Sequence, residues 1–136
     1  MKDFFLNNPT NKLHHDKIHF ILDNDDALNY HNKLEEYSKT PIIQLNALAK
    51  KIGVNKIFIK DESKRFRLNA YKVLGASYAI YKILSMNPKI STFCTATDGN
   101  HGMAVAWSCN MNNKESVIYV PKDTSDQRIQ NLTAIA

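Results

Sequence analysis

Apolar runs and amphipathic stretches alternate along the second half of the chain. Three β-favouring apolar runs predict strands at residues 56–60, 91–96 and 116–121. Residues at helical spacing predict two intervening helices. The first helix ends at Asn87-Pro88, and the residues on one of its faces are Ala70, Val73, Leu74, Ser77, Tyr81 and Leu84. The second helix is indicated by Met103, Ala106, Trp107 and Asn110. A last helix opens near residues 123–126. Strands separated by helices are typical of βαβ units, so the sequence predicts an α/β fold with a parallel sheet flanked by helices.

The first half of the chain has weaker patterns. Residues 1–24 are polar with scattered aromatic residues and are expected to form an irregular arm. Ala27, Tyr30, Leu34 and Tyr37 recur at helical spacing and predict a helix that cannot continue through Thr40-Pro41. A short helix over residues 47–52 is expected to stop at Gly53. We therefore divide the chain into an arm and helix at 1–40 and a partial α/β domain at 41–136.

Composition and charge narrow the class of protein. A chain of 136 residues with 43% hydrophobic and 23% charged residues is typical of one soluble globular domain. The formal charge of +5 comes from basic residues interleaved with acids, without the basic-aromatic stripe that reads single-stranded nucleic acid. No signal-peptide-like start and no run of eighteen apolar residues is present, so we expect a cytoplasmic protein with no membrane partner. Cys94 and Cys109 are expected to be two buried thiols in a reducing compartment.

Several kinds of site lack their sequence signature. His14, His15, His19 and His31 form no ligand set with acids or thiols, so no metal site is predicted. The chain has no nucleophile elbow, phosphate-binding lysine loop or dinucleotide fingerprint. It contains only four glycines, which are too few to build a glycine-rich phosphate cup.

Two polar loops carry the candidate chemistry. They read DESKRFRLN after the first predicted strand and TDGNHG after the second. Ligands of parallel sheets lie beyond the carboxyl ends of the strands, so we expect both loops at the same edge of the sheet. Lys72 lies in the first turn of the helix after the first loop, while Asp98 and Asn100 lie in the second loop.

Each loop has a functional and a structural interpretation. A lysine near the positive end of a helix suits Schiff-base chemistry, although an ordinary solvated helix lysine also fits the position of Lys72. Thr97, Asp98, Asn100 and two glycines can hold a carboxylate or phosphate at the start of the next helix, or simply form a polar turn that caps it. His101 is a possible proton carrier.

Three longer segments, taken together, resemble one enzyme family. They are KDESKRFRLNAYKVLGASYA (60–79), TATDGNHGMAVAW (95–107) and VIYVPKDTSDQRI (117–129). They are similar to the diaminopropionate ammonia-lyases of the fold-type II family of pyridoxal-phosphate enzymes, and the resemblance covers residues 36–130. It implies a partial tryptophan synthase β-like architecture, pyridoxal 5'-phosphate as cofactor, a small amino acid as substrate and a homodimer for the full-length protein.

The resemblance also implies roles for individual residues. Lys72 would bond covalently to the cofactor aldehyde, and Asn100 would hydrogen-bond the ring hydroxyl oxygen. Thr97, Gly99 and His101 would surround the substrate carboxylate. Asp98 would contact the second amino group or act as a base at the α-carbon. The implied reaction is α,β-elimination of 2,3-diaminopropionate to pyruvate and ammonia, with Lys72 the base for one enantiomer and Asp98 for the other.

Two departures from the family pattern leave alternatives open. Arg67 stands where the family usually has a small residue, often glycine. The phosphate cup and the residue facing the pyridine nitrogen are absent, so we expect an N-terminal fragment of such an enzyme. The alternatives are a threonine or serine dehydratase-like lyase, a non-catalytic remnant acting as a binding or interaction module, and a small basic nucleic-acid binder.

Overall fold

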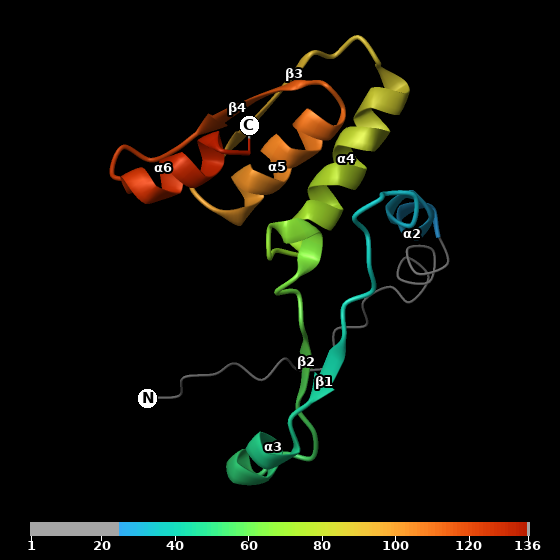
Figure 1. Cartoon of the computed structure of the whole chain (residues 1–136), viewed down its shortest axis with the longest axis vertical. Coiled ribbons are helices and arrows are strands. Elements are labelled where there is room, and N and C mark those ends of the chain that lie inside the picture. Colours follow the sequence, from blue (N-terminus) through green and yellow to red (C-terminus); the bar gives the residue numbers. More distant parts are fainter. Residues whose placement is uncertain (1–24, 136) are drawn as a thin grey trace, which may run out of the picture.

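The computed structural model describes residues 25–135, and the predicted arm over residues 1–24 lies outside this range. The elements, in chain order, are α2 (Asp26–His31), β1 (Ile42–Gln44), α3 (Asn46–Ile52), β2 (Phe58–Lys60), the 3₁₀ turn η1 (Arg65–Arg67), α4 (Lys72–Met86), β3 (Thr92–Ala96), α5 (Asn100–Met111), β4 (Glu115–Tyr119) and α6 (Asp126–Thr133). Figure 1 shows β3, β4 and helices α4 to α6 gathered in one body, from which β1, β2 and α3 project. The predicted division at residue 40 stays a prediction.

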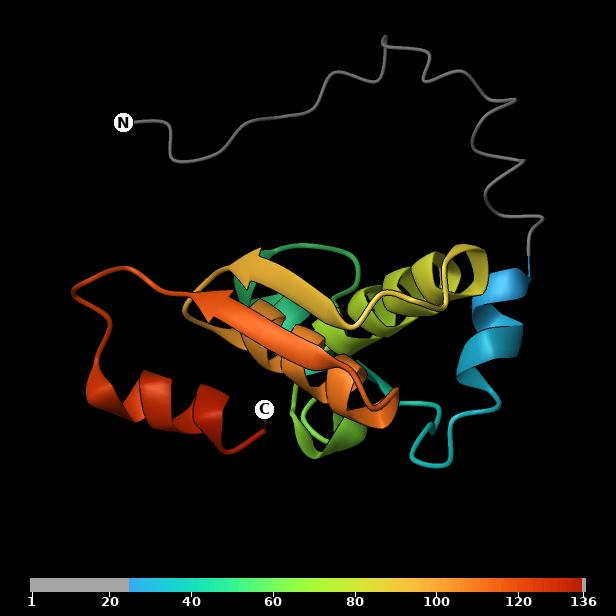
Figure 2. The ribbon, with the colours of Figure 1, turned by 90° about the horizontal axis from the view of Figure 1, so that it is seen from above.

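The β3–α5–β4 segment is the predicted βαβ unit. β3 and β4 pair in parallel, from Thr92 opposite Glu115 to Ala96 opposite Tyr119. Helix α5 joins them and packs against both strands, as Figure 2 shows from above. The α/β prediction is therefore confirmed, and the sheet contains these two strands within the described part of the chain.

Helix α5 lies between this sheet and α4, which explains its burial on several sides. Its buried residues are Gly102, Ala104, Val105, Ala106, Ser108 and Cys109. They are small, so α4 can approach closely and pack Val73, Ala76 and Ile80 against them. The core of the body thus lies between two helices rather than within the sheet.

The prediction that residues 56–60 join the parallel sheet is wrong. β2 instead pairs antiparallel with β1, with Ile43 opposite Ile59. The chain between them contains α3, and Leu45 N–H donates to the Ile57 carbonyl at 2.9 Å, which extends the antiparallel pairing toward that helix. Helix α4 does not serve as that crossover, because it packs on α5 and not on a sheet shared by β2 and β3.

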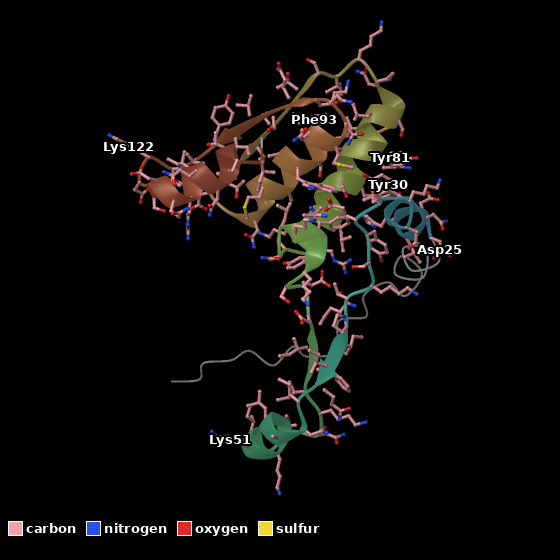
Figure 3. All side chains as sticks on the ribbon, in the orientation of Figure 1. Asp25, Tyr30, Lys51, Tyr81, Phe93 and Lys122 are labelled. Atoms are coloured by element: carbon pink, nitrogen blue, oxygen red, sulfur yellow. The ribbon has the colours of Figure 1, made fainter. Side chains whose placement is uncertain are left out.

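The predicted helix around Ala27 to Tyr37 is shorter than expected. α2 ends at His31, and tight turns follow, in which Leu34 N–H donates to the His31 carbonyl at 3.0 Å. The Tyr30 ring stacks on Tyr81 of α4 at 4.5 Å between centroids, and His31 Nε2 lies 2.8 Å from the Leu74 carbonyl oxygen (Figure 3). The turns then bring Tyr37 within 6.3 Å of the Phe66 ring, a position that a continued helix would not reach.

The two cysteines lie in different environments. Cys109 is buried in α5, and burial raises the pKa of its thiol. The prediction of a buried Cys94 is wrong, because Cys94 is exposed on the face of β3 that α5 does not cover. His14, His15 and His19 lie outside the described residues. Within residues 25–135, no three His, Cys, Asp or Glu side chains converge as metal ligands, and no helix has the length and apolarity to cross a bilayer.

Gly102 allows α5 to contact β4 and α6 at once. A Cβ atom at this position would lie 2.8 Å from Leu132 Cδ2, 3.1 Å from Thr97 Cγ2 and 3.2 Å from Ile118 Cγ2. The first distance is shorter than Cβ atoms show in proteins and the other two are tight, so a side chain here would force Leu132, Thr97 and Ile118 to shift. Gly75 in α4 is different, because a Cβ there would meet nothing within 4 Å.

We expect Gly102→Ala to lower the free energy of unfolding by about 1–3 kcal/mol, because the methyl group overpacks this contact. The matched change Gly75→Ala should raise it by about 0.5–1 kcal/mol through helix propensity alone. Urea unfolding followed by circular dichroism measures both. Equal stabilisation by the two alanines would show that α6 does not pack against Gly102.

Candidate functional site at the start of helices α4 and α5

Lys72 is the first residue of α4, and its side chain is exposed. Its ammonium group makes no hydrogen bond or ion pair with any residue between 25 and 135. No side-chain cap closes the start of the helix at Tyr71. The structure thus presents an unpaired amine at the positive end of a 15-residue helix.

The second loop lies between β3 and α5. Thr97, Asp98 and Gly99 are half-buried, whereas Asn100 and His101 are exposed in the first turn of α5. Thr97 N–H donates to the Tyr119 carbonyl at 2.9 Å, which holds the loop to the end of β4. No side chain caps this helix either, so its first backbone N–H groups point toward the same polar loop.

The two loops come to one end of the molecule by a different route from the one expected. β2 is not in the parallel sheet, so a shared sheet edge does not bring them together. Instead, α4 and α5 pack side by side, and both views show their first turns at the same end. Lys72 and Asn100 therefore start neighbouring helices.

Arg128 is a residue of this region that sequence reasoning missed. Its Nη1 forms an ion pair with Asp98 Oδ2, although thirty positions separate the two residues. Both line an open hollow of about 280 Å³, together with Gly99, Asn100, Met103, Asn131 and Leu132. An arginine in a polar amphipathic helix is usually exposed to solvent, so the sequence gives no indication that Arg128 contacts Asp98.

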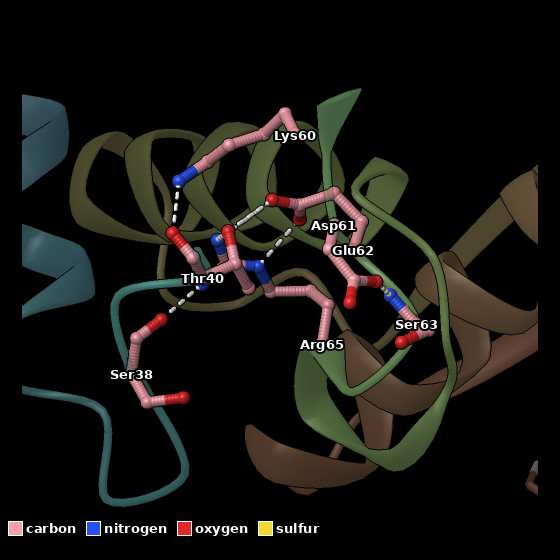
Figure 4. A network of polar contacts seen from close by, with 7 residues as sticks. All are labelled: Ser38, Thr40, Lys60, Asp61, Glu62, Ser63 and Arg65. Atoms are coloured by element: carbon pink, nitrogen blue, oxygen red, sulfur yellow. Dashed lines mark hydrogen bonds and ion pairs between the residues drawn. The ribbon is translucent and has the colours of Figure 1, made fainter. Parts of the chain in front are cut away.

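A buried arginine anchors the loop that leads to Lys72 (Figure 4). Arg65 is 4% exposed, and its Nε donates to Glu62 Oε2 at 2.7 Å. Its two Nη atoms donate to the Ser38 carbonyl at 2.6 Å and to Thr40 Oγ1 at 2.9 Å. Lys60 Nζ donates to the Thr40 carbonyl. The network therefore joins the segment before β1 to the segment after β2.

The charges in this network stabilise each other. Hydrogen bonding from Arg65, opposed by partial burial, holds the pKa of Glu62 below its usual range. Hydrogen bonding to Glu62 in turn raises the pKa of Arg65. The guanidinium carbon also lies 5.3 Å from the centroid of the Tyr37 ring, a cation–π distance. A buried cation needs such compensation, since removing it from water is costly.

Three non-glycine residues after Arg65 have left-handed backbone conformations. Phe66, Arg67 and Asn69 have φ values of 49°, 56° and 55°. Such conformations are unfavourable for side chains other than glycine and persist only where the surrounding structure enforces them. A glycine, which the resemblance leads us to expect at this position, would suit the backbone at Arg67 better than arginine does. The Arg67 side chain is 88% exposed and points to solvent.

Comparison with known proteins agrees with this geometry. The family model described as "Pyridoxal-phosphate dependent enzyme" matches residues 33–135. The chain belongs to this family. It is 40% identical over 120 residues to diaminopropionate ammonia-lyase of Escherichia coli K12, covering 76% of this chain and 30% of that enzyme. It is 30% identical over 95 residues to the biosynthetic L-threonine dehydratase of Lactococcus lactis, covering 70% of this chain and 22% of that enzyme.

A solved structure extends the comparison to three dimensions. The Escherichia coli diaminopropionate ammonia-lyase in complex with an aminoacrylate–PLP azomethine intermediate superposes with a TM-score of 0.75 and 40% identity. The superposition covers 80% of this chain and 31% of that one. The tryptophan synthase β-like family architecture is thereby confirmed, and the chain spans about 30% of the length of these relatives.

The family cofactor is pyridoxal 5'-phosphate, and the residues present fit one side of it. Lys72 offers an amine without a partner in the described residues, and Asn100 offers an exposed amide at the start of α5, which packs against α4. A phosphate group needs several converging backbone N–H groups, usually from a glycine-rich loop. With four glycines, none adjacent to another, this chain supplies no such loop.

We expect Arg67→Gly to raise the free energy of unfolding by about 0.5–1 kcal/mol, because relief of the left-handed conformation exceeds the entropy cost of glycine. The lost side chain contributes little, since its 3.9 Å pair with Glu36 is exposed. Arg67→Ala removes the same side chain and should give no gain. Urea unfolding distinguishes the two, and equal effects of alanine and glycine would rule out backbone strain.

The Glu62–Arg65 pair predicts a pH dependence of stability. The pKa of Glu62 is lower in the folded than in the unfolded chain. The ionised Glu62 therefore stabilises the folded state fully at pH values above its unfolded pKa of about 4.3. This stabilisation is lost as the pH falls through the folded pKa of Glu62. Glu62→Gln should lower stability at neutral pH and flatten its decline in acid. Urea unfolding over a pH series measures this. Glu35→Gln, an exposed glutamate, is the control, and an equal pH dependence in both variants would contradict the prediction.

Proposed function

We propose that this chain is the lysine-bearing N-terminal part of an ammonia-lyase that converts 2,3-diaminopropionate to pyruvate and ammonia. The proposal rests on the amine of Lys72 at the start of α4, which has no partner among residues 25–135, and on the packing of α4 against α5, the helix that follows Asp98 and begins at Asn100. Relatives that share these segments are named diaminopropionate ammonia-lyases. A role in amino-acid catabolism, a cytoplasmic location and a homodimeric full-length protein belong to the same proposal.

In this proposal, each residue has a defined role. Lys72 holds the cofactor covalently, and Asn100 donates a hydrogen bond to its ring oxygen. Thr97, Gly99 and His101 surround the substrate carboxylate. Once bound, pyridoxal phosphate supplies an electron sink that stabilises the charge left by removal of the α-proton.

The protons are moved by this chain's own side chains. The amine of Lys72, once displaced by the substrate amine, takes the α-proton of one enantiomer, and the carboxylate of Asp98 takes that of the other. The carbon 3 amine then leaves as ammonia, and hydrolysis releases pyruvate and a second ammonia. One base at the start of α4 and another in the loop before α5 would approach the α-carbon from opposite sides.

A dehydratase-like activity on threonine or serine is the second candidate. It is supported by the match to the L-threonine dehydratase of Lactococcus lactis. Asp98 favours the first candidate, because a second amino group on the substrate gives an acid at this position a cationic partner.

Cofactor attachment to Lys72 tests the proposal directly. The chain is incubated with pyridoxal phosphate, reduced with borohydride and digested, and the modified lysine is located by mass spectrometry. We expect modification at Lys72, its loss in Lys72→Ala and its retention in Lys82→Ala, an exposed lysine of the same helix. Pyruvate release from diaminopropionate, against 2-oxobutyrate release from threonine, then separates the two candidates.

Other outcomes would redirect the proposal. Modification spread evenly over exposed lysines, or none at all, would contradict a cofactor site in this chain and favour a binding or interaction module. Retention on DNA or RNA that falls steeply with salt, without modification at Lys72, would favour a nucleic-acid binder.

A further inference from the structure

The Asp98 carboxylate is held by one residue of a distant helix. Arg128 of α6 pairs with its Oδ2 atom. No other hydrogen bond or ion pair reaches this carboxylate from residues 25–135. One oxygen, Oδ2, is therefore anchored, and the other, Oδ1, has no hydrogen-bond partner among residues 25–135, in a side chain that lines the hollow with Arg128.

The packing of α6 explains why Arg128 reaches this position. Leu132 is 6% exposed and contacts α5 at Gly102. Arg128 precedes Leu132 by four residues, so both lie on the same face of α6. The contact at Gly102 therefore directs the guanidinium toward the loop between β3 and α5.

The ion pair itself contributes little to stability. Its side chains are 60% and 38% exposed for Arg128 and Asp98, and ion pairs with this exposure have small net stability effects. A carboxylate on a loop that ends at a helix start still needs a fixed direction if it is to remove a proton from a bound molecule. Orientation is thus the function that the contact can supply.

We propose that Arg128 is a positioning residue that orients the Asp98 carboxylate, and this inference rests on the proposed function of Asp98 as a base. Arg128 fixes Oδ2, and Oδ1 faces the substrate α-carbon. Through Leu132 and Gly102, the position of α6 determines the direction of this base.

The contact is tested first without turnover. Carbon-13 NMR at neutral pH follows the side-chain carboxylate resonance of Asp98, assigned by its absence in Asp98→Asn. We expect this resonance to move in Arg128→Gln and to move less in Arg128→Lys. Lys122→Gln removes one exposed charge from the loop before α6 and should leave it in place. An equal shift in Arg128→Gln and Lys122→Gln would overturn the proposal.

The consequence is then tested with both enantiomers of diaminopropionate. Arg128→Gln should lower kcat about 10- to 100-fold for the enantiomer that depends on Asp98, with little change in KM or in the rate for the other enantiomer. Arg128→Lys should recover part of the loss. If Arg128 had only a structural role, Arg128→Gln would lower the rates for both enantiomers equally, and this result would overturn the proposal.

Absence of turnover in the unsubstituted chain would instead contradict the proposed function, and the NMR result alone would then decide whether Arg128 orients Asp98.

Discussion

The close approach of α5 to its neighbours is the constraint on which the described structure depends. The helix lies between a two-stranded sheet and α4, and it meets α6 at Gly102, where a Cβ atom would crowd Leu132, Thr97 and Ile118. Small residues on its other faces let α4 pack closely. Because α4 and α5 run in the same direction in contact, their first turns, and the residues that begin them, lie at one end of the molecule.

A second constraint acts on the loop before Lys72. Three residues in this loop have left-handed backbone conformations, and a loop with such strain needs strong external contacts to keep one shape. Arg65 supplies them through a carboxylate, a hydroxyl and a carbonyl from two chain segments. The charged network therefore holds the loop that leads to the start of α4.

The sequence predicted the helices and strands of the second half of the chain well. In α4, α5, β3 and β4, the spacing of apolar residues indicates which side of each element is buried. This spacing was sufficient to predict that these four elements form. It failed for residues 56–60, because a short apolar run does not reveal its pairing partner, and β1 has too few residues to be recognised. It also failed for the exposure of Cys94, because the outer face of the sheet is uncovered in the described residues.

The sequence by itself determined the α/β class, the order of the elements from α4 to α6 and the placement of Lys72 in the first turn of a helix, because these follow from periodicity within a few turns of chain. Only the tertiary structure decided that β1 pairs with β2, that Arg65 is buried with Glu62 and Thr40, and that Arg128 contacts Asp98. Arg65 and Thr40 are 25 positions apart in the sequence, and Arg128 and Asp98 are 30 positions apart. The formation of these contacts depends on how the helices pack, and no local pattern of residues encodes that packing.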